Sequence, residues 1–233
     1  DNHIVDHFNR RGSFGQRYLY FDDFQDPQTS RPIVLIEVRG EDDQKDMDWI
    51  GYDVLQIAFQ LEAIIVALEH RFYGNSIPVK SPTLADLKEL LRVDQSIHDI
   101  RTFRDHLINK HNLPNAQFVL IGCSYAGNLA AWTRVSFPSL FVGAIASCPG
   151  LGLQYDYPGY NNAIGAALSN PALGGTDDCL SFVNWVNDII MRKLATPVGR
   201  QYLESFFGLT SGFLSDENSK RWTTVGGGSP VQQ

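Results

Sequence analysis

The chain has 233 residues, of which 43% are apolar and 19% charged, a composition typical of a globular protein with one sizeable core. Its formal net charge is −7 and it has no basic stripe, which argues against a nucleic-acid partner because phosphate binding needs clustered Lys and Arg. No apolar run is long enough to predict a membrane span. The chain begins with Asp rather than Met and shows no signal peptide, so we expect a processed or trimmed product.

Strands and helices alternate along the first 147 residues. Apolar runs predict buried strands at 33–38, 63–68, 118–121 and 141–146, with an edge strand at 16–21. Helical spacing and start signals predict helices at 52–61, from 81–83, from 94 to about 111, and at 128–137. This alternation predicts an α/β fold with a mostly parallel sheet covered by helices on both faces. Beyond residue 150 the pattern changes to helices at 179–194 and 199–207, with a loop at 155–160.

The stretch 118–127 predicts a strand, a tight turn and a helix. Gly122, Ser124 and Gly127 form a Gly-x-Ser-x-x-Gly pattern, and Ala126 stands where the common nucleophile elbow has its second Gly. In such an elbow the hydroxyl of Ser124 is exposed above the sheet, and the N–H of Tyr125 points at a developing oxyanion. The alternative is a Gly-rich turn that carries an ordinary Ser.

Four residues lie just past the ends of predicted strands, namely Gly40, His70, Ser124 and Ser147. Ligands of parallel sheets bind beyond the carboxyl ends of the strands, so we expect these four residues to converge.

Metal and cofactor binding are not expected. Cys123, Cys148 and Cys179 lack metal-type spacing, and no pair of histidines has ligand spacing. A disulfide between Cys148 and Cys179 is one option that the sequence leaves open. The aspartates at positions 42, 43, 46 and 48 are expected to form a solvated acidic loop.

Three motifs in register resemble one family of serine peptidases. The first is Asp-His-Phe-Asn at 6–9, followed by Phe-x-Gln-Arg-Tyr at 14–18. The second is Glu-His-Arg-Phe-Tyr-Gly at 69–74, and the third is the elbow with Leu-Ala-Ala-Trp at 129–132. Together they resemble the prolylcarboxypeptidase, dipeptidyl peptidase II and thymus-specific serine protease family.

The resemblance implies an α/β-hydrolase core at 1–150 and the start of a helical cap or insertion at 151–225. The Gly-rich composition of the last residues predicts a flexible tail at 226–233. It also implies peptide substrates, with cleavage after proline, and a lysosomal or secreted location. Carboxypeptidase and dipeptidyl peptidase activity both stay open.

The resemblance also implies roles for individual residues. Ser124 matches the nucleophile, and Tyr125 would supply an oxyanion N–H. Gly40 and Glu41 match the loop after the first core strand, where Asp42 replaces a Gly of the family and puts one oxyanion contact in question. Glu69 and His70 belong to a motif that the family uses to scaffold the pocket, which favours a structural role for His70 over that of a general base.

A general base is missing from the expected place. In α/β-hydrolases the chain order is Ser, then Asp or Glu, then His. All six histidines precede Ser124, although acids follow it, for example Asp177. His7 is expected to dock the N-terminal segment, and the histidines at 98, 106 and 111 to be solvated.

We therefore expect the front part of an enzyme with an incomplete sheet, whose base and acid come from a C-terminal segment or chain. The alternatives are a truncated isoform or pseudoenzyme with a peptide-binding role, and another α/β-hydrolase such as an esterase or lipase.

Overall fold

A computed structural model describes residues 2–9, 11–41, 50–154 and 157–215. The chain divides into two compact units, Asp1–Leu153 and Gln154–Gln233. The predicted acidic loop at 42–48 and the predicted tail at 226–233 lie outside the described residues. The predicted boundary between core and cap, at residue 150, falls close to the division between the units, while the cap role of the second unit stays a prediction.

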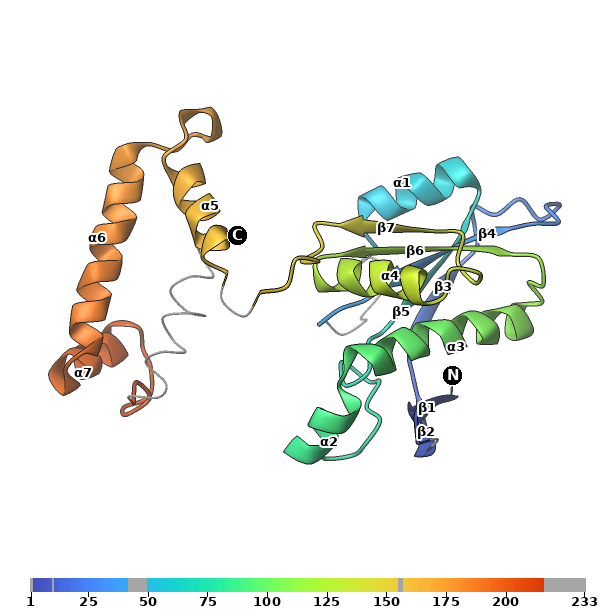
Figure 1. Cartoon of the computed structure of the whole chain (residues 1–233), viewed down its shortest axis with the longest axis horizontal. Helices are drawn as coiled ribbons and strands as arrows, with labels where there is room; N and C mark the ends of the chain where they lie inside the picture. Colours follow the sequence, from blue (N-terminus) through green and yellow to red (C-terminus); the bar gives the residue numbers. More distant parts are fainter. Residues whose placement is uncertain (1, 10, 42–49, 155–156, 216–233) are drawn as a thin grey trace. The chain divides into compact units, whose positions relative to one another are not determined.

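The first unit is built on a five-stranded sheet (Figure 1). Its strand order is β3-β5-β4-β6-β7. The strands are β3 (Tyr18–Phe21), β4 (Ile33–Val38), β5 (Ile64–Leu68), β6 (Gln117–Cys123) and β7 (Gly143–Ser147). Every pairing is parallel except that of β3 with β5, which is antiparallel. The predicted fold class, an α/β-hydrolase-type sheet that is mostly parallel and not closed, is confirmed.

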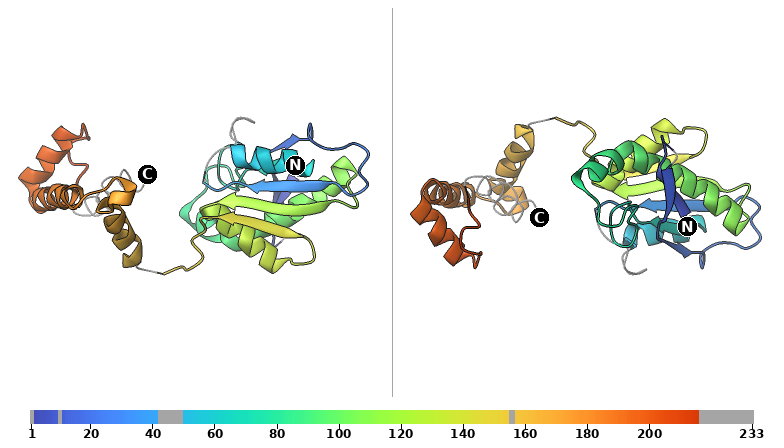
Figure 2. Two further views of the ribbon diagram at one scale, coloured as in Figure 1. Left: turned by 90° about the horizontal axis from the view of Figure 1, so that it is seen from above. Right: turned by 90° about the horizontal axis from the view of Figure 1, so that it is seen from below.

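Alternate residues of each inner strand face opposite layers of helices. Val34, Ile36 and Val38 of β4 pack with α3 (Val93–His111) and α4 (Tyr125–Ser136), as do Phe118 and Leu120 of β6. Leu35, Ile65 and Ile121 face the other way and pack with Val54 and Ala58 of α1 (Tyr52–Leu61). Figure 2 shows the sheet from the α1 side and from the α3 side. This two-sided burial explains why the inner strands are apolar at almost every position.

The sequence also explains where the helices begin and end. The short helix α2 (Leu84–Leu90) starts at a capping box, in which Thr83 and Asp86 each accept a hydrogen bond from the other's backbone. Helix α3 ends at Asn112, whose φ of 53° and ψ of 55° are left-handed. The elbow helix α4 begins at Tyr125, three residues before its predicted start, so Ser124 lies at the helix terminus.

A hairpin that the sequence did not predict precedes the sheet. Strands β1 (Asn2–Asp6) and β2 (Arg11–Gly15) pair antiparallel, and β1 contacts α3. His3 and Asp6 are buried there, although both are polar. The hairpin brings the Asp-His-Phe-Asn motif against α3.

Every regular element described in the second unit is helical. The elements are α5 (Pro158–Leu168), a 3-10 turn η2 (Pro171–Leu173), α6 (Asp177–Leu194) and α7 (Pro197–Phe206). The prediction of a loop at 155–160 is wrong from Pro158 onward, because a proline in the first turn of a helix forgoes an N–H that has no partner there anyway. Within the described ranges, no helix combines the length and apolar character needed to cross a bilayer.

Candidate active site

Ser124 occupies a sharp turn between β6 and α4. Its backbone has φ of 55° and ψ of −125°, a strained conformation for a residue with a side chain. The N–H of Ser124 donates to the carbonyl oxygen of Ser147 on β7 at 2.9 Å, and the N–H of Asn128 donates to the carbonyl oxygen of Ser124 at 3.1 Å. The strained residue is therefore held from both sides, as in a nucleophile elbow.

The two glycines of the motif allow this turn because neighbouring backbone atoms leave no room for a side chain at these positions. A Cβ at Gly122 would lie 2.4 Å from the carbonyl oxygen of Ala126, and one at Gly127 would lie 2.9 Å from that of Ser147. Ala126 itself is buried against the sheet and packs in the core. The spacing Gly-x-Ser-x-x-Gly thus places glycine where the backbones touch, and the turn accommodates Ala126.

The N-terminal turn of α4 supplies backbone N–H groups beside Ser124. The first N–H groups of a helix have no carbonyl of a preceding turn to pair with, and Tyr125 is the first residue of α4. Gly40 lies against the same turn, because a Cβ built on it would be 3.6 Å from the backbone nitrogen of Ala126 and from Cδ1 of Tyr125. This arrangement can bind a developing oxyanion. Asp42, which put this loop in question, lies outside the described residues.

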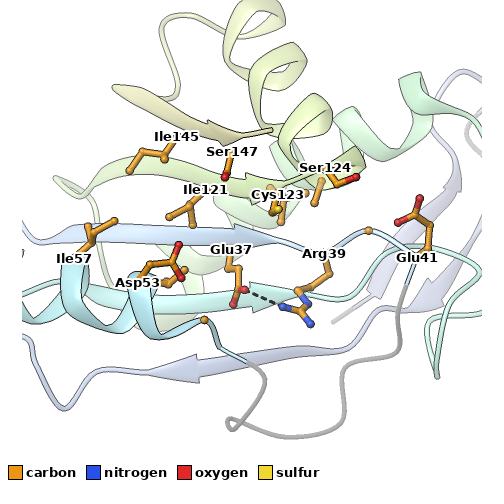
Figure 3. Close-up of a pocket in the computed structure, with 16 residues that line it drawn as sticks. Glu37, Arg39, Glu41, Asp53, Ile57, Ile121, Cys123, Ser124, Ile145 and Ser147 are labelled. Carbon is orange, nitrogen blue, oxygen red and sulfur yellow. Dashed lines mark hydrogen bonds and ion pairs between the residues drawn. The ribbon is translucent and has the colours of Figure 1, made fainter. Parts of the chain in front are cut away.

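A pocket of about 450 Å³ opens in front of Ser124 (Figure 3). It is lined from β4, α1, β6 and β7 and from the loop after β4. Its lining includes Gly40, Glu41, Ser124 and Ser147, so three of the four residues expected to converge do so. His70 and Glu69, also candidates for this pocket, do not line it and instead border a much smaller cavity next to Ser96 and Asp99.

Glu37 brings a carboxylate into the pocket from the middle of the sheet. It is 7% exposed, and its Oε1 accepts a hydrogen bond from Nη1 of Arg39 at 2.8 Å. Its other oxygen has no hydrogen-bond partner in the described part of the chain. Burial raises the pKa of Glu37, and Arg39 opposes this shift. Glu37 was not among the predicted site residues, although a charged residue inside an otherwise apolar strand was a signal.

Both ring nitrogens of His70 are engaged away from Ser124. Nδ1 lies 2.7 Å from the carbonyl oxygen of Arg71, which can only accept, so Nδ1 carries the proton. Nε2 lies 2.9 Å from Oγ of Ser96 and 3.2 Å from the hydroxyl of Tyr125. Burial lowers the pKa of His70, so the neutral ring is favoured. His70 thus contacts the side chain of the residue after Ser124, which suits a positioning role.

The neighbours of His70 form a buried ionic network. Nε and Nη2 of Arg71 each donate to an Asp99 oxygen at 2.6 Å, and its remaining hydrogen bonds go to carbonyl oxygens of Ile4, Val5 and Leu90. These bonds hold the pKa of Asp99 well below its usual range, against the opposing effect of burial. The Glu69 carboxylate accepts hydrogen bonds from Ser76 and from the backbone of Asn75. The motif at 69–74 therefore ties the loop after β5 to α3 and to the hairpin.

The remaining histidines also lie away from the pocket. His7 contacts Asp99, with 2.7 Å between Nε2 and Oδ1, so the prediction that His7 docks the N-terminal segment is confirmed. The histidines of α3 were predicted to be solvated, and this is wrong. His98 bonds to a backbone carbonyl, His106 lies against Tyr18, and the ring of His111 stacks on Tyr20 at 3.9 Å. Tyr18 and Tyr20 both belong to the edge strand β3, and the three histidines are half-buried.

Comparisons with known proteins identify the family. A protein-family model described as "Serine carboxypeptidase S28" matches residues 3–226. A thymus-specific serine protease of Mus musculus is 30% identical over 208 residues, which is 88% of this chain and 40% of that protein. A lysosomal Pro-X carboxypeptidase of Pongo abelii is 34% identical over 154 residues, which is 61% of this chain and 29% of that protein. The chain thus spans less than half the length of these relatives.

The matches to solved structures have low sequence identity. A monoacylglycerol lipase of Paleococcus ferrophilus has a TM-score of 0.42 and 16% identity, covering 67% of this chain and 51% of that one. The match over residues 3–226, which is most of the chain, includes all three motifs and the elbow around Ser124. The chain therefore belongs to the serine carboxypeptidase S28 family.

Proposed function

We propose that Ser124 is the nucleophile of a serine exopeptidase that cleaves peptides after proline. The observation that carries the proposal is the strained backbone of Ser124 at the junction of β6 and α4, beside an open pocket. Membership of a serine peptidase family supports the reaction type. The preference for proline is supported by the similarity to a lysosomal Pro-X carboxypeptidase, which also supports a lysosomal or secreted location.

In this mechanism the Oγ of Ser124 attacks the scissile carbonyl carbon, and its proton passes to a general base. The carbonyl oxygen becomes an oxyanion, which the N–H of Tyr125 and the loop at Gly40 stabilise. The base then gives the proton to the leaving amine, and water hydrolyses the acyl-enzyme. Loss of one oxyanion donor in such sites lowers kcat by about 10²–10³.

The base and its orienting carboxylate come, in this proposal, from outside these 233 residues. His70 is a poor base because its Nδ1–H is donated to a carbonyl and its Nε2 meets Ser96 and Tyr125. Its role is to position Tyr125 and through it the first turn of α4. The greater length of the relatives leaves room for a segment that supplies the Asp and the His.

A second candidate is a protein that binds peptides without cleaving them. It is favoured by one observation, that no histidine of the described residues lines the pocket at Ser124. The pocket would then serve as a peptide-binding surface.

Labelling with a fluorophosphonate, followed by peptide mass spectrometry, separates these possibilities. We expect an adduct on Ser124 in the longer protein that includes the downstream sequence, and a much weaker adduct in the 233-residue chain. Ser124→Ala is the control for specificity. Labelling of the isolated chain as strong as that of the longer protein would contradict the proposal, because a base would then lie within these 233 residues. Absence of labelling in both proteins would favour the non-catalytic candidate.

Substrate choice is tested by mass spectrometry of cleaved peptides. A peptide that ends in Pro-X should release its last residue if the protein is a carboxypeptidase. Release of an N-terminal X-Pro dipeptide would show a dipeptidyl peptidase instead. Cleavage without regard to proline would contradict the proposed specificity.

A further inference from the structure

Two thiols lie side by side next to the candidate nucleophile. Cys123 is the last residue of β6, and Cys148 follows directly after β7. The parallel register pairs Cys123 with Ser147, which brings the next residue, Cys148, to the same edge. The two Sγ atoms are 3.2 Å apart. This contact joins two neighbouring strand ends across 25 positions of sequence.

Both thiols are accessible to a reagent. Cys123 and Cys148 are exposed, and Cys123 lines the pocket in front of Ser124 (Figure 3). Cys148 has a φ of 41°, so the chain leaves the strand direction at this residue. Thiol–disulfide exchange requires such access.

The environment of the pair also favours reaction at Cys148. The hydrogen bond with the Cys123 thiol lowers the pKa of Cys148. The same thiol contact raises the pKa of Cys123. Because the thiolate is the reactive form, Cys148 is the thiol expected to attack first.

We propose that Cys123 and Cys148 form a reversible disulfide that ties the ends of β6 and β7 together beside Ser124. The oxidant is a small-molecule disulfide such as oxidised glutathione. The Cys148 thiolate attacks one sulfur of the oxidant and releases the first thiol. Cys123 then loses its proton and attacks Sγ of Cys148, which releases the second thiol. The two cysteines lose two electrons and two protons in total, and the oxidant gains both as two thiols.

The bond can close with little movement of the backbone. A disulfide has an S–S length of about 2.05 Å, so the two sulfurs need to approach by only about 1.1 Å. The disulfide would flank the hydrogen bond from Ser124 to Ser147, one residue away on each strand. It would therefore reinforce the junction of β6, β7 and α4. Since it also closes a loop in the unfolded chain, we expect the oxidised protein to unfold at a higher temperature than the reduced one.

The test is disulfide mapping of the whole chain after incubation with oxidised glutathione. Free thiols are alkylated, and the protein is digested without reduction. Trypsin alone leaves Cys148 and Cys179 in one peptide, residues 135–192, so a protease that cleaves before aspartate is added to cut at 156 and 177. We expect a peptide with Cys123 joined to Cys148, an alkylated Cys179, and loss of the linkage on treatment with dithiothreitol.

Matched variants complete the test. Cys179→Ser should keep the linkage and the rise in the unfolding midpoint, whereas Cys148→Ser should lose both. A linkage of Cys148 to Cys179 would overturn the proposal, as would recovery of Cys123 and Cys148 only as free thiols or as mixed disulfides with glutathione. Equal midpoints of the reduced and the linked protein would overturn the inference that the bond ties the two strands together.

Discussion

Replacing Gly122 by Ala should strain the elbow and destabilise the chain. The added Cβ would lie 2.4 Å from the carbonyl oxygen of Ala126, 2.5 Å from its carbonyl carbon and 2.9 Å from the nitrogen of Gly127. All three atoms are backbone of the first turn of α4 and cannot rotate away. Restoring a contact of 3.0–3.4 Å requires the oxygen and the Cβ to separate by a further 0.6–1.0 Å (3.0 − 2.4 and 3.4 − 2.4). Overpacking of this kind lowers the free energy of unfolding by about 1–3 kcal/mol.

Urea unfolding monitored by tryptophan fluorescence measures this loss, because Trp132 lies on α4. Gly40→Ala is the matched control, since its Cβ would come no closer than 3.6 Å to any atom, an ordinary contact. We expect a clear drop in the midpoint for Gly122→Ala and little change for Gly40→Ala. If both variants unfold at the same urea concentration, the close approach of α4 to Gly122 does not constrain the elbow, and the reasoning is refuted.

Arg71→Met should lower the free energy of unfolding by about 3–5 kcal/mol, because Asp99 stays buried without its cation. Adding Asp99→Leu should recover part of this loss, and purely additive losses would contradict a shared ion pair. Burial, and then the charge of Lys110, lowers the pKa of His106 to about 4. The unfolded chain therefore binds this proton first, so the contribution to stability is complete above pH 6.5 and is lost as the pH falls through about 4. His106→Gln should flatten this part of the stability–pH curve, and an ordinary His106 pKa in an NMR titration would contradict the prediction. The described strands leave one side of β7 unpaired, and Ile145 on it is 41% exposed. We expect concentration-dependent association in sedimentation experiments, weakened by Ile145→Lys, and a monomer at every concentration would argue against edge pairing.

The inner strands of the sheet were predictable from their apolar residues, whereas the buried strand predicted at 141–146 is the half-exposed edge strand β7. The strands Ile33–Val38 and Ile64–Leu68 are apolar almost throughout, which is the pattern of a strand covered on both faces. The hairpin could not be predicted in this way. Its polar residues His3 and Asp6 are buried against side chains of α3, which lie far away in the sequence. Arg71 adds a hydrogen bond to the backbone carbonyl of Val5 on the same strand. The pattern of apolar and polar residues within the hairpin does not indicate such partners.

The candidate site also has a part that local sequence predicts and a part that depends on distant contacts. Ser124 and Tyr125 were found from a local motif, since the strand, the small residues and the helix are adjacent in sequence. The contacts of His70 with Ser96 and Tyr125 span 26 and 55 positions, and their geometry appears only in the folded chain. The position of His70 just past a strand end predicted that its side chain would line the pocket. Instead the ring turns toward α3, where Ser96 and the backbone of Arg71 satisfy its nitrogens.

Elements of the first unit hold the elbow in the described part of the chain. Its hydrogen bonds involve Ser147 of β7 and Asn128 of α4, and its close contacts join Gly122 of β6 to the first turn of α4. The position of Ser124 therefore does not depend on where the general base comes from. Replacing the base should strongly reduce labelling of Ser124 while leaving the unfolding midpoint unchanged, whereas Gly122→Ala should lower both. Geometry and activation of the nucleophile are thus separate properties of this chain, and the two experiments together show which of them is absent when Ser124 does not react.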